Sequence, residues 1–160
     1  MARNLAVLGA TGSIGKSTLD VVREQKGAFR VISLAARSSW EALLPQVLEF
    51  RPHMVAVVDP AAARKLRGEL KDRGVRCTVL DGARGLVEAA CADAVDTVVA
   101  GLTGAAGLLP TVAAIKAKKN IALANKEVLV AAGELETRLV RQHRVQLLPV
   151  DSEHSAILQC

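Results

Sequence analysis

The sequence predicts an α/β fold built on a doubly wound parallel sheet. Two observations predict it. Seven short apolar runs alternate with segments of helical periodicity, and the first run leads directly into a glycine-rich turn. Continuous apolar runs are typical of parallel strands covered by helices on both faces. Strands that alternate with helices form βαβ units, whose crossovers we expect to be right-handed. With 160 residues, 51% of them hydrophobic, the chain is long enough for one domain and too apolar for disorder.

Each expected strand is a continuous apolar run with almost no charge. In chain order the runs are Leu5–Leu8, Val31–Ala35, Met54–Val58, Val75–Leu80, Val95–Ala100, Ile121–Ala124 and Val145–Val150. Because the chain has only three aromatic residues, we expect these strands to bury an aliphatic core.

Helical segments are expected between the strands. Apolar or small residues at helical spacing share one face at Ile14, Thr18, Val21 and Val22, and another at Trp40, Leu43, Leu44, Val47 and Leu48. Pro110 suits the first turn of a helix. A charged helix is predicted over residues 134–144, with Leu135 and Leu139 facing inward.

An uncharged stretch over residues 97–115 has nearly the length of a membrane span. Three glycines and Pro110 interrupt it, so we interpret it as a buried strand, a glycine turn and the start of a helix. No membrane association is expected. The odd count of three cysteines, without metal-ligand spacing, predicts free thiols in a reducing compartment such as the cytoplasm.

The formal net charge of +5 is spread along the chain. With three aromatic residues there are few rings on which nucleic-acid bases would stack, so we expect no nucleic-acid partner. Mild basicity suits a compact anionic small molecule equally well.

The glycine-rich turn is the sequence Gly9-Ala10-Thr11-Gly12-Ser13-Ile14-Gly15. Gly9 allows a tight turn, Gly12 allows close approach of a pyrophosphate, and Gly15 allows close packing of helix on strand. Exposed N–H groups and the helix dipole then favour an anion. The sequence therefore predicts a dinucleotide site, with a purely structural turn as the alternative.

The second expected strand ends at Ala36-Arg37-Ser38, where an NAD site would carry an acid for the ribose 2′-hydroxyl. No acid is near in the sequence. The Arg37 guanidinium offers paired donors to a 2′-phosphate, which favours NADP(H) over NAD(H). The alternative is a solvated loop arginine.

A second motif overlaps the first. The segment Ala10–Ser17 fits a relaxed Walker A sequence, and Met54–Asp59 resembles a Walker B strand. In a P-loop NTPase, Lys16 would contact phosphates and Ser17 would hold magnesium. This alternative leaves Arg37 and the motifs near the C-terminus unexplained.

Polar residues follow the last two expected strands. Asn125-Lys126-Glu127 comes directly after one, where Lys126 is placed to steady an oxyanion or phosphate; the alternative is an N-cap at Asn125. Asp151 and Glu153 follow the other, and both carboxylates can reach one hard cation. The alternative there is a helix cap, with Glu153 in the first turn.

Four motifs occur together in this order: the glycine turn, Gly104-Ala105-Ala106-Gly107-Leu108-Leu109-Pro110-Thr111, Leu123-Ala124-Asn125-Lys126-Glu127, and Leu148-Pro149-Val150-Asp151-Ser152-Glu153-His154-Ser155-Ala156-Ile157. The set closely resembles the 1-deoxy-D-xylulose 5-phosphate reductoisomerase family, over essentially the whole chain. The resemblance implies a Rossmann-like NADPH-binding domain over residues 1–150, and over residues 151–160 the start of a catalytic domain whose remainder lies beyond this sequence.

The resemblance also implies an activity: NADPH-dependent conversion of 1-deoxy-D-xylulose 5-phosphate to 2-C-methyl-D-erythritol 4-phosphate for isoprenoid precursors, with Mg²⁺ or Mn²⁺. This chain alone is expected to be inactive. The full-length enzyme is expected to be a homodimer acting on a phosphorylated sugar. A stand-alone NADP(H)-binding module without catalysis is the alternative.

The resemblance assigns roles residue by residue. The cofactor-binding residues it implies are Thr11, Gly12, Ser13, Ile14, Ala36, Arg37, Ser38, Asn125 and Glu127. The implied catalytic or substrate-contacting residues are Lys126, Ser152 and Glu153, and the implied metal ligands are Asp151 and Glu153.

Overall fold

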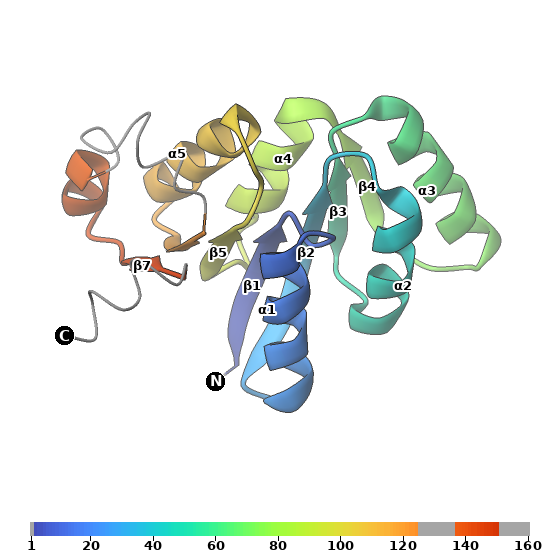
Figure 1. The fold of residues 1–160 in the computed structure, drawn as a ribbon, viewed down its shortest axis with the longest axis horizontal. Coiled ribbons are helices and arrows are strands. Elements are labelled where there is room, and N and C mark those ends of the chain that lie inside the picture. Colours follow the sequence, from blue (N-terminus) through green and yellow to red (C-terminus); the bar gives the residue numbers. More distant parts are fainter. Residues whose placement is uncertain (1, 125–136, 151–160) are drawn as a thin grey trace.

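The seven expected strands lie in a single sheet (Figure 1). The structure is a computed structural model that describes residues 2–124 and 137–150. Its elements, in chain order, are β1 (Arg3–Leu8), α1 (Ser13–Glu24), β2 (Phe29–Ala36), α2 (Trp40–Phe50), β3 (Met54–Val57), α3 (Pro60–Asp72), β4 (Thr78–Asp81), α4 (Gly82–Cys91), β5 (Thr97–Ala100), the 3₁₀ turn η1 (Ala105–Gly107), α5 (Leu108–Lys116), β6 (Asn120–Leu123) and β7 (Leu147–Pro149). Residues 137–143 are also helical.

The strand order is β4-β3-β2-β1-β5-β6-β7, and every pairing is parallel. The chain winds outward from β1 to β4 and then returns to the other side of β1 with β5. The direction of winding therefore reverses between β1 and β5, and ligands of open α/β sheets bind at such a switch point, outside the carboxyl ends of the strands.

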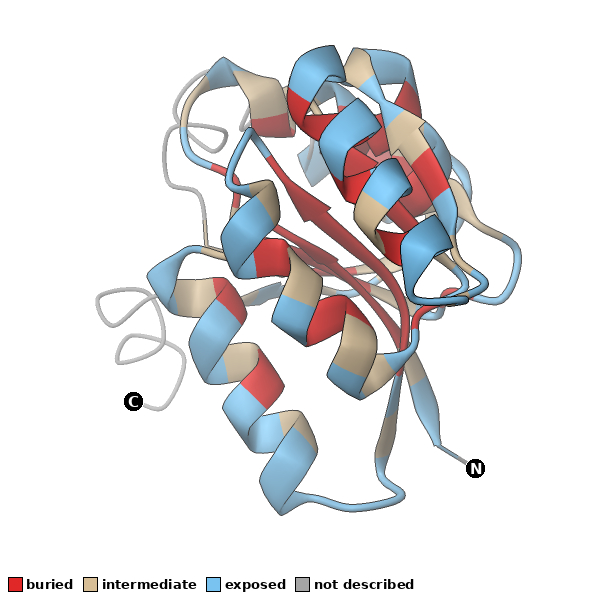
Figure 2. Ribbon diagram, turned by 90° about the vertical axis from the view of Figure 1, so that its right-hand side faces the viewer, coloured by how far each residue is buried: buried red, intermediate tan, exposed pale blue. Residues whose placement is uncertain are grey.

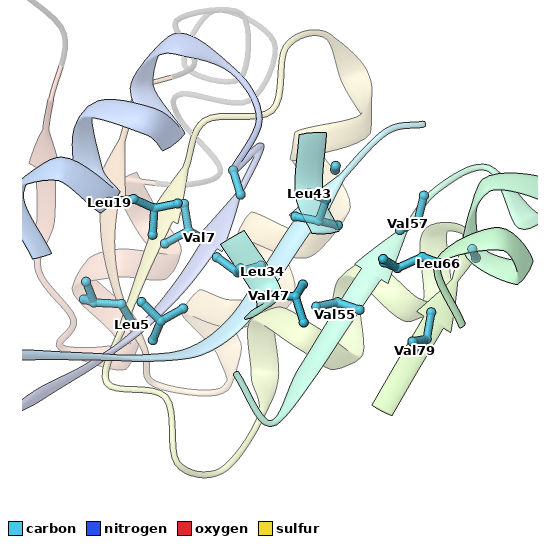
Figure 3. Packing of buried hydrophobic residues seen from close by; sticks show 14 of the residues in the cluster. Leu5, Val7, Leu19, Leu34, Leu43, Val47, Val55, Val57, Leu66 and Val79 are labelled. Carbon is cyan, nitrogen blue, oxygen red and sulfur yellow. The ribbon is translucent and has the colours of Figure 1, made fainter. Parts of the chain in front are cut away.

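Helices cover both faces of the sheet, which confirms the doubly wound arrangement. Successive residues of a strand point to opposite faces, so Leu5 and Val7 pack with α1, α2 and α3, whereas Ala6 and Leu8 pack with α4 and α5. Figure 3 shows the first of these clusters, in which Leu43 and Val47 of α2 lie over the strands. Buried residues are concentrated in the central strands, and the helices carry exposed residues outward (Figure 2).

Several details of the expected elements are wrong. The strands β4, β5 and β7 begin two or three residues later than expected, at Thr78, Thr97 and Leu147. Val75 does not begin the fourth strand, because its N–H donates to the Leu70 carbonyl oxygen at 2.9 Å and closes the end of α3. Val21 is not on the buried face of α1. Gly15 and Leu19 set that face, and Val21 lies about 200° around the helix from Leu19, which leaves it 45% exposed.

The other expected helical features are confirmed where the structure describes them. The uncharged stretch forms β5, a turn and α5, with Pro110 in the first turn of that helix. Leu139 is buried against the face covered by α4 and α5, while Leu135 lies outside the described residues. Among the residues described, no helix is long and apolar enough to cross a membrane.

Candidate functional site

The glycine-rich turn connects the central strand β1 to helix α1, at the carboxyl edge of the sheet beside the switch point. Its backbone is fixed from the β2 side, because the N–H groups of Gly9 and Ala10 both donate to the Ala35 carbonyl oxygen at 2.8 Å. Within the turn, the Gly12 N–H donates to the Gly9 carbonyl oxygen at 3.0 Å. These backbone hydrogen bonds define the conformation of the loop.

Two of the three glycines have the structural roles that the sequence predicted. Gly9 has φ +85°, and a Cβ atom there would lie 2.6 Å from the Gly101 carbonyl oxygen. A Cβ atom on Gly15 would lie 2.5 Å from Ala10 Cα and would overlap the Gly9 carbonyl oxygen. Gly9 therefore makes the turn and Gly15 brings α1 against the loop.

Gly12 differs from the other two, because a Cβ atom there would be only in ordinary contact, 3.4 Å from the Gly9 carbonyl oxygen. Gly12 is exposed and is the N-cap residue of α1, where it supplies no side-chain cap. The missing side chain leaves the end of the helix open to a bulky ligand, as expected for the glycine that a pyrophosphate approaches.

The N-terminus of α1 presents backbone donors that have no partner in the part of the chain that the structure describes. The first intrahelical bond is donated by Lys16 to the Gly12 carbonyl oxygen at 2.9 Å, so the N–H groups of Ser13, Ile14 and Gly15 precede it. No acidic residue lies in the first turn. Ser13 is exposed and Ile14 is half-buried. The positive end of the helix dipole is thus available to an anion.

Arg37 follows β2 on the same edge of the sheet and is exposed. Its Nη2 donates to the Thr103 carbonyl oxygen at 3.2 Å, so the side chain extends from the end of β2 toward the loop after β5. Ala36 is fully buried at the end of the strand, and Ser38 is exposed. The structure therefore brings Arg37 and Ser38 to the same edge as the glycine turn, while Ala36 contributes backbone only.

An acidic residue does come near Arg37, although none follows it closely in the sequence. The Asp59 N–H donates to the Arg37 carbonyl oxygen at 2.9 Å, because β3 lies beside β2. The Asp59 carboxylate, however, accepts a hydrogen bond from the Ala61 N–H at 2.8 Å and caps α3. The Asp59 carboxylate therefore already has a structural role as a helix cap. This role competes with the two functional roles it could have, as a ligand of the ribose and as the Walker B acid of the P-loop alternative.

Sequence reasoning missed Gln46, which reaches the glycine turn from α2. Its Nε2 donates to the Ala10 carbonyl oxygen at 2.9 Å, and the residue is buried. Gln46 lies among the expected apolar residues of that helix, but no local signal indicated that its amide would meet a loop 36 residues earlier.

The remaining predicted site residues, Asn125, Lys126, Glu127, Asp151, Ser152 and Glu153, lie outside the described residues. The two segments that lead into them, one ending at residue 124 and the other at residue 150, lie side by side, since the Val150 N–H donates to the Leu123 carbonyl oxygen at 3.0 Å. Within residues 2–124 and 137–150, no cluster of three His, Cys, Asp or Glu side chains is arranged to hold a metal ion.

The comparison with protein families decides what this arrangement belongs to. The family described as 1-deoxy-D-xylulose 5-phosphate reductoisomerase matches residues 5–133, most of the chain. The chain belongs to this family. The match includes the glycine turn, Arg37 and the residues that follow β6.

Curated members of the reductoisomerase family are similar over the whole chain. The enzyme of Heliobacterium modesticaldum is 52% identical over 160 residues, which are 100% of this chain and 41% of the relative. The enzyme of Chlorobaculum tepidum is 53% identical over 157 residues, 98% of this chain and 41% of the relative. The chain thus spans about two fifths of the length of the reductoisomerases it matches.

Solved reductoisomerase structures share the fold. One described as a complex with magnesium is 44% identical, with a TM-score of 0.97 over 100% of this chain and 40% of that one. The Zymomonas mobilis reductoisomerase in complex with NADPH is 43% identical, with a TM-score of 0.94 over 100% of this chain and 41% of that one. These likenesses confirm the predicted α/β fold of the NADPH-binding type.

Proposed function

We propose that this chain is the NADPH-binding part of a 1-deoxy-D-xylulose 5-phosphate reductoisomerase that makes 2-C-methyl-D-erythritol 4-phosphate. One observation carries the proposal. The open N-terminus of α1 and the Arg37 guanidinium lie on the same edge of the sheet, beside its switch point. A dinucleotide with an extra phosphate needs two anion sites of this kind.

The pyrophosphate would bind at the glycine turn. The donors present fit it: the amides of Ser13 and Ile14 at an uncapped helix start, and Thr11 half-buried beside them. Gly12 leaves room for close approach. Backbone amides cannot lose their protons at ordinary pH, so the site is suited to a permanently charged group.

The 2′-phosphate would bind at Arg37. A guanidinium has five N–H donors, and among the described residues only Nη2 has an acceptor, the neutral carbonyl oxygen of Thr103. The exposed hydroxyl of Ser38 adds a donor beside it, and the buried Ala36 fixes where the two residues leave the strand. This donor set favours NADPH over NADH, because NADH has no phosphate at this position.

The residues proposed for chemistry follow from the family motif. Asn125 and Glu127 are proposed to contact NADPH, Lys126 the substrate, Asp151 and Glu153 the metal, and Ser152 and Glu153 the substrate. The bond between Val150 and Leu123 supports a common site, since residues 125 and 151 continue from neighbouring strand ends. When bound, NADPH supplies the hydride, and Mg²⁺ or Mn²⁺ acts as a Lewis acid on the substrate oxygens.

The domain division and partners remain proposals from the same resemblance. Residues 1–150 would form the cofactor domain and residues 151–160 would begin the catalytic one. The whole enzyme would act on a phosphorylated sugar as a homodimer. Solved relatives bound to NADPH, fosmidomycin and magnesium support the cofactor and the metal for the family.

Titration of the 160-residue chain with NADPH, NADH and ATP, followed by nicotinamide fluorescence or calorimetry, tests the proposal. We expect binding of NADPH, weaker binding of NADH and no binding of ATP. Assay with 1-deoxy-D-xylulose 5-phosphate and magnesium should show no turnover by this chain. Binding of ATP that is lost in Lys16→Ala, without binding of NADPH, would instead support the P-loop alternative.

A further inference from the structure

The side-chain amide of Gln46 is buried, and of its two polar atoms one has a hydrogen-bond partner and the other has none among the described residues. It is 8% exposed, in the second turn of α2, and its Nε2 donates to the Ala10 carbonyl oxygen at 2.9 Å. Its Oε1 is buried without a partner among the described residues. A buried acceptor without a partner destabilises a fold. An apolar side chain of the same length would avoid the unpaired acceptor. The advantage of a glutamine at this position is therefore the hydrogen bond from its Nε2 to the Ala10 carbonyl oxygen.

Through this hydrogen bond, Gln46 fixes the orientation of one peptide unit of the glycine turn. The Ala10 carbonyl and the Thr11 N–H belong to the same planar, trans peptide, so they point in opposite directions. Gln46 holds the carbonyl inward, toward the buried face of α2. The Thr11 N–H is thereby directed away from α2, and it meets no acceptor within residues 2–124 and 137–150. The Ala10 N–H is held as well, by the Ala35 carbonyl oxygen.

We propose that Gln46 is a positioning residue for the cofactor. By holding the Ala10 carbonyl, it turns the Thr11 N–H outward as a donor to the pyrophosphate. The inference rests on the proposed NADPH function. It adds a residue of α2 that acts through the Ala10 carbonyl rather than through a contact of its own with the cofactor. Without Gln46, the peptide is free to rotate and must be ordered when the cofactor binds.

The test is Gln46→Met, which keeps side-chain length and helix propensity but removes the donor. The matched control is Ser33→Ala. Ser33 is fully buried, and its Oγ donates to the Ala89 carbonyl oxygen at 2.7 Å, so this variant also leaves one carbonyl without its donor, on the α4 side of the sheet. Affinity is measured for NADPH and for 2′-AMP, which has the 2′-phosphate but no pyrophosphate.

We expect Gln46→Met to weaken NADPH binding about tenfold, the effect of losing one hydrogen bond to a charged group. Binding of 2′-AMP should stay within about twofold of wild type, since Arg37 is untouched. Ser33→Ala should change neither affinity. In wild type, NADPH should shift the ¹⁵N–¹H resonance of Thr11, and the shift should be smaller in Gln46→Met at saturation.

The outcomes separate this inference from the proposed function. If wild type binds NADPH and Gln46→Met binds it equally well, Gln46 has no positioning role and the proposed function stands. If Gln46→Met weakens NADPH and 2′-AMP alike, the variant has damaged the fold generally, and the positioning role is also rejected. If wild type binds neither NADPH nor 2′-AMP, the proposed function itself fails.

Discussion

The Arg37 guanidinium donates a hydrogen bond from Nη2 to the carbonyl oxygen of Thr103 at 3.2 Å. Arg37 follows β2 and Thr103 follows β5, and these two strands flank β1. The side chain therefore spans the strand end from which the glycine turn leaves. A phosphate bound by Arg37 would compete with a neutral carbonyl oxygen, which is the weaker acceptor of the two.

Replacing this side chain should remove cofactor discrimination. We expect Arg37→Ala to weaken NADPH binding about 10- to 100-fold and to leave NADH binding unchanged, because charge-assisted hydrogen bonds to the 2′-phosphate are lost. Fluorescence titration of both nucleotides measures this. Arg30→Ala is the control, since Arg30 is an exposed arginine near the start of the same strand and contacts His53. Equal weakening of NADPH and NADH in Arg37→Ala would contradict the assignment.

Alanine substitutions at two glycines should change stability in opposite directions. Gly15→Ala should lower the free energy of unfolding by about 1–3 kcal/mol, because its Cβ atom would meet backbone atoms of Ala10. Gly68→Ala, in α3 with no atom within 4 Å of the new Cβ, should raise it by about 0.5–1 kcal/mol. Urea unfolding of both variants measures the difference. A Gly15→Ala variant as stable as wild type would show that the loop can move away from the helix.

We expect the free energy of unfolding to fall at alkaline pH because of the Cys77 thiol. Partial burial raises its pKa from the ordinary value of 9.0 to about 11. Between these two values the unfolded thiol has lost its proton and the folded one has kept it, so the free energy of unfolding falls as pH rises from about 9 to about 11. Cys77→Ala should show a smaller fall in urea midpoints over this range.

The same thiol should react slowly with iodoacetamide at neutral pH, since the thiolate is the nucleophile. Peptide mapping distinguishes Cys77 from Cys91, whose pKa is also raised by burial. Rapid labelling of Cys77 at pH 7 would contradict the raised pKa.

The ion pair between Arg23 of α1 and Glu49 of α2 should stabilise the fold only when Glu49 is charged. Arg23 donates from Nε to Glu49 Oε1 at 2.6 Å and from Nη2 to Oε2 at 2.7 Å. These bonds lower the pKa of Glu49 below 4.5. The ion pair therefore contributes to the free energy of unfolding above pH 4.5, and this contribution is lost as the pH falls through the lowered pKa of Glu49. Both side chains are exposed, so the contribution is under about 1 kcal/mol.

A double-mutant cycle with Arg23→Met and Glu49→Gln measures this coupling. We expect a favourable coupling at pH 7 that becomes smaller as the pH is lowered below 4.5 and Glu49 begins to take up its proton. A coupling that does not change with pH would assign it to packing, since the guanidinium also lies 5.1 Å from the Phe50 ring centroid.

The sheet could be predicted from the sequence because its central strands are buried on both faces and are therefore continuously apolar. The glycine turn could be predicted for a similar reason: Gly9 and Gly15 are required by backbone contacts that any side chain would disturb. The buried face of α1 was harder to predict. A small residue, Gly15, sets that face, and small residues contribute little to a hydrophobic pattern.

The contacts that join distant segments could not be predicted. Gln46 meets Ala10, Arg37 meets Thr103 and Asp59 meets the backbone of Arg37 only because the sheet order brings their strands and helices together. In the sequence, Gln46 is one of three polar residues in an otherwise apolar helix, and Asp59 suits a helix cap and a metal ligand equally well. Which of these roles a residue has depends on neighbours that folding supplies.

The position of β1 has a consequence for synthesis of the chain. β1 is made first, but it lies at the centre of the sheet, between β2 and β5. While the ribosome is still adding residues, β1 gains one neighbour once β2 is complete and waits for the other until residues 97–100 emerge. Throughout that interval one hydrogen-bonding edge of β1 is open on the nascent chain. Pausing of translation within α4 would prolong this exposure and give chaperones, or the β1 edge of a neighbouring nascent chain, time to bind there.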